Sequence, residues 1–115
     1  MLLSPLAYTA EKDVNKQWCA GMNGDYEFRT KDGTYIDCLT NEFAVEAEYD
    51  YKWKESIGQS LHYAETTNKK AAILFIKRIE TKKDYLSELN RVISKFDLPI
   101  KVFVTSEYWE FLRLY

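Results

Sequence analysis

Hydrophobic and polar residues alternate over the first half of the chain, as they do in β-strands with one buried face. The segments 25–30 and 34–40 show this pattern, and Lys31-Asp32-Gly33 separates them. An Asp-Gly pair between two such segments is a strong hairpin signal. A third segment, 43–49, follows the short connection Asn41-Glu42. The pattern predicts an antiparallel meander of three strands.

Apolar residues at helical spacing predict a helix on either side of this meander. The first helix is expected over about 6–20, where Pro5 and Thr9 are start signals and Gly21 is a stop signal. The second helix is expected to run from Tyr51 to about residue 66.

The second half of the chain adds a strand, a helix and a strand. The continuous apolar run over 71–76 is typical of a strand that is buried on both faces. Residues 83–96 form an amphipathic pattern, and 100–105 read as a last strand. Residues 106–115 are expected to form a short aromatic helix. A meander followed by β-α-β crossovers predicts the α/β class, here an α+β mixed sheet with helices on both faces.

Length and composition favour one ordered domain over residues 1–115. The chain is 46% hydrophobic and 16% aromatic, which is typical of a packed core and excludes a disordered segment. Neither a membrane span nor a signal peptide is recognisable, so we expect a cytoplasmic protein. Cys19 and Cys38 lack the pairing of a metal site, and we expect free thiols in a reducing compartment.

The charges are unevenly distributed along the chain. The net charge of −2 argues mildly against a nucleic-acid-binding protein. However, residues 1–50 carry four Lys and Arg against ten Asp and Glu, whereas residues 51–83 carry eight against three. An acidic half therefore precedes a basic segment, and this asymmetry suggests separate roles for different surfaces.

Three carboxylates are expected to converge on the predicted sheet. Side chains alternate between the two faces of a strand, so Glu46 and Glu48 share a face and lie about 6.6 Å apart along it. Asp37 can lie across from them on the neighbouring strand. Hard cations such as Mg²⁺ or Mn²⁺ prefer such oxygen ligands.

The helix expected over 51–66 has two distinct stripes, about 130° apart around its axis. The apolar stripe, which is expected to face the core, consists of Trp53, Ile57, Leu61 and Ala64. The polar stripe consists of Lys52, Glu55, Gln59 and Tyr63. The polar stripe could face the carboxylate site or a phosphate backbone.

The order Asp37, Glu46-x-Glu48 and Gln59-x-x-x-Tyr63 on consecutive elements resembles the PD-(D/E)XK nuclease superfamily. It is most similar to the branch that includes the RecB nuclease domain and lambda exonuclease, which carries a Q-x-x-x-Y helix. The resemblance covers about residues 11–76. It implies a restriction-endonuclease-like αβββαβ core, to which this chain adds a C-terminal αβ(α) extension.

The resemblance also implies a metal-binding role for four residues. Asp37 and Glu46 would hold Mg²⁺ or Mn²⁺ through their carboxylates, and the Ala47 carbonyl would be a further ligand. Glu11 occupies the place on the first helix where many members carry an extra carboxylate.

The remaining residues of the pattern would serve the reaction. Glu48 would orient or activate the attacking water, although most members carry Lys at this position, and Lys52 could supply the missing cation. Gln59 and Tyr63 would brace the site and the nucleic-acid strand. Each residue also has an ordinary interpretation, because a strand face, a surface lysine or a helix surface can carry these residue types without any chemistry.

Three functions follow as hypotheses. The first is a Mg²⁺- or Mn²⁺-dependent deoxyribonuclease that hydrolyses phosphodiester bonds by in-line attack of a metal-activated water. The alternative is a catalytically inactive module of the same fold that binds nucleic acid or protein in a regulatory role. A structural interaction protein with a solvated acidic strand face is the third. The expected partners are DNA, with RNA not excluded, and a second copy or another protein.

Overall fold

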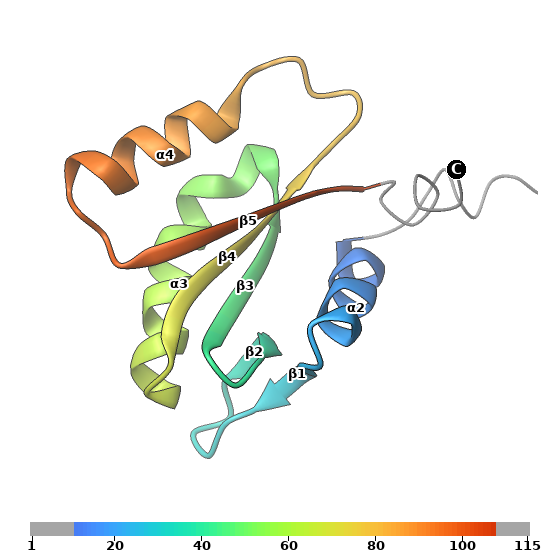
Figure 1. Ribbon diagram of the computed structural model, residues 1–115, viewed down its shortest axis with the longest axis vertical. Coiled ribbons are helices and arrows are strands. Elements are labelled where there is room, and N and C mark those ends of the chain that lie inside the picture. Colours follow the sequence, from blue (N-terminus) through green and yellow to red (C-terminus); the bar gives the residue numbers. More distant parts are fainter. Residues whose placement is uncertain (1–10, 108–115) are drawn as a thin grey trace, which may run out of the picture.

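A computed structural model describes residues 11–107 as a five-stranded sheet flanked by helices (Figure 1). The strands lie side by side in chain order. The pairs β1–β2 and β2–β3 are antiparallel, whereas the pairs β3–β4 and β4–β5 are parallel. The predicted mixed α+β sheet is therefore confirmed. The elements are α2 (Glu11–Gly21), β1 (Asp25–Arg29), β2 (Tyr35–Leu39), β3 (Phe43–Tyr49), the 3-10 turn η1 (Asp50–Lys52), α3 (Trp53–Thr67), β4 (Lys70–Lys77), α4 (Tyr85–Lys95) and β5 (Ile100–Ser106).

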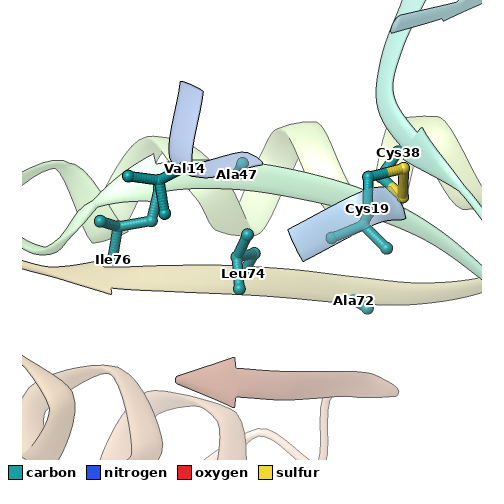
Figure 2. Close-up of a cluster of buried hydrophobic side chains, with 8 residues drawn as sticks. Val14, Cys19, Cys38, Ala47, Ala72, Leu74 and Ile76 are labelled. Atoms are coloured by element: carbon teal, nitrogen blue, oxygen red, sulfur yellow. A yellow bond between two sulfur atoms is a disulfide. The ribbon is translucent and has the colours of Figure 1, made fainter. Parts of the chain in front are cut away.

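Strand β4 is buried on both of its faces, as its apolar run predicts. Ala72, Leu74 and Ile76 point to one side, where Val14 of α2 and Ala47 of β3 join them (Figure 2). The intervening residues Ala71, Ile73 and Phe75 belong to a second buried cluster on the opposite side. The sheet therefore has a core on each face.

One helix layer covers each face of the sheet (Figure 1). Helix α2 packs over the first cluster, and α3 and α4 pack over the second. The predicted core stripe of α3 is confirmed, because its four residues all lie in or against the second cluster: Trp53, Ile57, Leu61 and Ala64. The predicted alternation of side chains along β3 is also confirmed, since Val45 and Ala47, which alternate with Glu46 and Glu48, lie in the first cluster.

Helix α3 begins later than the sequence predicts, because a buried carboxylate reshapes its start. Asp50 is fully buried, and its Oδ1 accepts the backbone N–H of Tyr51 at 2.8 Å. Its Oδ2 accepts the N–H of Arg78 at 3.3 Å, which ties the end of β3 to the end of β4. The chain forms η1 around this carboxylate before the regular helix begins at Trp53.

Parts of two predicted helices fall on residues 1–10 and 108–115, outside the described residues. The start signals Pro5 and Thr9 are among them. Within the described part, the helix expected over 106–115 does not begin at Ser106. Residue 106 instead continues β5, where it pairs with Lys77 of β4.

A disulfide between Cys19 and Cys38 joins α2 to β2, so the prediction of free thiols is wrong. Both cysteines are fully buried in the first cluster (Figure 2). The sequence reveals no pairing because it does not show that α2 crosses β2. Gly24 lies against the bridge: a Cβ atom at this position would be 2.5 Å from Cys38 Sγ and 2.8 Å from Cys19 Sγ.

We predict that Gly24→Ala destabilises the oxidised protein by about 1–3 kcal/mol, because the added methyl overpacks the site beside the disulfide. Gly58→Ala is the matched control, since a Cβ at Gly58 meets no atom within 4 Å. As an exposed alanine in a helix it should stabilise the protein by about 0.5–1 kcal/mol. Urea denaturation of both variants without reductant measures the difference, and equal stabilities would contradict the close contact at Gly24.

Candidate functional site

A polar pocket of about 400 Å³ lies where α2 and α3 meet the sheet. Seven of the residues predicted from the sequence line it together: Glu11, Asp37, Glu46, Ala47, Glu48, Gln59 and Tyr63. Lys52 does not line the pocket, although its positive charge is near enough to act on Glu11. The structure therefore assembles most of the predicted residues in one place.

The pocket opens where β2 separates from β3. The two strands pair only at Cys38 with Val45 and at Leu39 with Ala44. At the next position of β2, the side chain of Asp37 makes the contact with β3 in place of the backbone: its Oδ2 accepts the backbone N–H of Ala47 at 2.8 Å. The carboxylate thus replaces a strand-to-strand hydrogen bond and is fixed at the pocket wall.

Two residues of α3 close the pocket from the helix side. The Tyr63 hydroxyl donates to Gln59 Oε1, one turn earlier, at 3.3 Å. The Tyr63 ring is 8% exposed and packs in a small cluster with Ile36 of β2 and Ala44 of β3. Gln59 and Tyr63 therefore hold α3 against the strands that carry the carboxylates.

Burial favours the protonated form of two carboxyl groups in the pocket. Burial raises the pKa of Glu46 to about 10, and a hydrogen bond with Asp37 and the surrounding negative charges raise it further. Burial and a hydrogen bond with Glu48 raise the pKa of Glu11 to about 8, while Lys52 opposes this shift. At neutral pH, Glu46 is therefore protonated and paired with Asp37, and Glu11 is mostly protonated and paired with Glu48.

Asn15 is a pocket residue that the sequence reading missed. It lies one turn after Glu11 on α2, is 3% exposed, and donates through Nδ2 to the Asp37 carbonyl at 2.8 Å. Its Oδ1 is buried without a hydrogen-bond partner. The sequence signal that could have identified Asn15 is its spacing of four residues from Glu11, which places both residues on one face of a helix. Tyr26 and Glu27 of β1 also line the pocket without having been predicted.

The arrangement of the carboxyl groups bears on metal binding. Within residues 11–107, no group of three or more His, Cys, Asp or Glu side chains is arranged to hold a metal ion. The carboxyl groups pair with each other instead, Glu46 with Asp37 and Glu11 with Glu48. The metal-binding roles drawn from the resemblance remain predictions.

Comparison with known proteins found one informative relative. Over 93 residues the chain is 32% identical to the KilA-N domain-containing protein L33 of Acanthamoeba polyphaga mimivirus. The match covers 81% of this chain and 37% of the viral protein, so the chain spans little more than a third of that relative. No family model and no solved structure matches the chain.

The assignment to the PD-(D/E)XK superfamily is wrong, and so is the metal-dependent nuclease function drawn from it. The relative carries a KilA-N description, and the described residues contain no cluster arranged for a metal ion. The motif combined Asp, Glu, Gln and Tyr, and Asp and Glu together account for 18 of 115 residues. Such common residues can gather around a buried polar pocket in an unrelated family.

None of the helices within residues 11–107 has the length and apolar character needed to cross a bilayer.

We predict that Glu46→Gln flattens the dependence of stability on pH. The folded protein keeps a proton on Glu46 that the unfolded chain releases near its ordinary pKa of 4.5. The free energy of unfolding of the wild type should therefore fall as pH rises from 5 to 9. Glutamine has no proton to lose, and the variant should remove as much as ~1.4 kcal/mol per pH unit of this slope.

Urea denaturation between pH 5 and 9, with a chelator present, measures the effect. Glu55→Gln is the control, because it makes the same Glu-to-Gln change at an exposed position on α3 outside the pocket. The same pH slope in Glu46→Gln as in the wild type would show that Glu46 is ionised in the folded protein.

Proposed function

We propose that this chain is a DNA-binding domain. The observation that supports the proposal is the 93-residue match to a viral protein described as KilA-N domain-containing, and we take that type of domain to bind DNA. That description belongs to the whole viral protein, of which this chain spans 37%. The proposal applies it to the shared region.

The charges of the chain support this proposal. Although the net charge is −2, residues 51–83 carry eight Lys and Arg against three Asp and Glu. In addition, protons on Glu46 and Glu11 reduce the negative charge of the acidic half at neutral pH. Both features lower the repulsion that a phosphate backbone would meet.

We predict that the purified protein binds DNA with an affinity that falls as salt concentration rises, because binding releases counterions from the phosphates. Fluorescence anisotropy with labelled duplex DNA, single-stranded DNA and RNA of one sequence measures this. Tighter binding to RNA than to either form of DNA would identify RNA, and not DNA, as the ligand. No binding to any of the three at low salt would overturn the proposal.

A second candidate function is uptake of Mg²⁺ or Mn²⁺ in the pocket, and the unpaired Oδ1 of Asn15 favours it. Oxygen donors suit these hard cations. Asp37 and Glu46 would supply carboxylates, the Ala47 carbonyl a further ligand, and Glu11 an additional carboxylate. The cation would have to displace the protons that pair these groups and draw the side chains around itself.

We therefore predict that Mn²⁺ binds more tightly at pH 8.5 than at pH 6.5, since metal ligands must lose their protons. Titration calorimetry with Mn²⁺ at the two pH values measures this. Asp37→Asn should abolish the binding, whereas Asp32→Asn, an exposed change in the β1–β2 turn, should leave it intact. Absence of binding at both pH values would leave the pocket as a proton-paired structural cluster.

A further inference from the structure

A groove between α3 and α4 combines aromatic surface with positive charge. Its volume is about 490 Å³. Helices α3 and α4, whose residues line it, cover the same face of the sheet (Figure 1). Seven residues line it: Trp53, Lys54, Glu88, Arg91, Val92, Lys95 and Phe96. Three of the seven are cations, and they come from two segments that are about 40 residues apart in the chain.

The one carboxylate in the groove is already engaged. Glu88 Oε1 accepts the indole N–H of Trp53 at 3.2 Å, and its Oε2 pairs with Lys83 at 3.2 Å. Among the described residues, the charged groups of Lys54, Arg91 and Lys95 make no hydrogen bond or ion pair, although Arg91 is close enough to Glu88 and Asp84 to help lower the pKa of both carboxyls. Arg91 and Lys95 lie four residues apart on α4, a spacing at which like charges repel. An anionic ligand would relieve this repulsion.

Phe96 gives the groove an exposed aromatic face. The ring follows the last turn of α4 and is 64% exposed. Its backbone is held, since its N–H donates to the Val92 carbonyl at 3.1 Å. Lys95 Nζ lies 5.8 Å from the centre of the ring, so a cation and a flat aromatic surface are presented side by side.

We infer that this groove binds single-stranded DNA, with Arg91, Lys95 and Lys54 contacting phosphates and Phe96 stacking on a base. This inference rests on the proposed DNA-binding function and locates it. Aromatic side chains beside cations are the usual means of holding single strands, because an unpaired base exposes its flat face. In a duplex that face is covered by neighbouring bases. The groove shares no lining residue with the carboxyl-lined pocket.

Two variants separate the charge contribution from the stacking contribution. Arg91→Gln/Lys95→Gln should weaken binding to single-stranded DNA roughly ten-fold and reduce the slope of log affinity against log salt by about 1.4. Phe96→Ala should weaken binding about ten-fold without changing that slope. The matched controls are Lys16→Gln/Lys31→Gln and Tyr35→Ala, all exposed positions outside the groove, and they should bind as the wild type does.

Fluorescence anisotropy with labelled single-stranded and duplex DNA, together with thermal unfolding of each variant, distinguishes the outcomes. Wild-type binding that both groove variants retain overturns this inference and leaves the proposed function standing. Preference of the wild type for duplex, with no effect of Phe96→Ala, overturns the single-strand assignment. Failure of the wild type to bind any DNA overturns the proposed function and this inference together.

Discussion

The burial of β4 on both faces is the constraint on which the rest of the structure depends. Leu74 and Ile76 point to one side of the sheet and Ile73 and Phe75 to the other, and all are 2% exposed or less. Apolar surface on both sides has to be covered, so the chain places a helix layer on each face. The disulfide fixes α2 over its face, and the apolar stripe of α3 fixes α3 over the other.

The acidic pocket and the groove both lie where a helix layer meets a neighbouring element at its margin. The acidic pocket forms where β2 leaves β3 and α2 and α3 reach past the sheet. There Asp37 compensates for the missing strand pairing by accepting the Ala47 N–H. The groove forms where α4 packs beside α3. Helix α3 thus contributes both to a pocket lined by carboxyl groups and to a groove lined by three cations.

Local patterns predicted much of the fold and the membership of the pocket. The alternation over 43–49 predicted both the bounds of β3 and the face that carries Glu46 and Glu48. The hairpin signal at Lys31-Asp32-Gly33 likewise gave the β1–β2 connection, and the shared face predicted that the carboxylates meet. Each of these results depends on spacing within one or two neighbouring elements.

The features that the sequence did not reveal depend on contacts between distant segments. The disulfide requires α2 to cross β2, and the role of Asn15 requires its side chain to reach the Asp37 carbonyl. The groove brings residues 53–54 to residues 91–96, so no local motif marks it. The family assignment failed for a different reason: the order of acidic, amide and phenol groups described the pocket correctly but was not specific to one family.

The most direct test of the central claim is to map the DNA contacts on the protein by NMR. The claim is that DNA is bound on the α4 side of α3 and not at the acidic pocket. Adding single-stranded DNA to labelled protein should shift the Trp53 indole N–H and the backbone amides of Arg91, Lys95 and Phe96. The side-chain amides of Asn15 and Gln59 should not move. Shifts at Asn15 and Gln59 with an unchanged α4 would place the DNA at the pocket and contradict the claim.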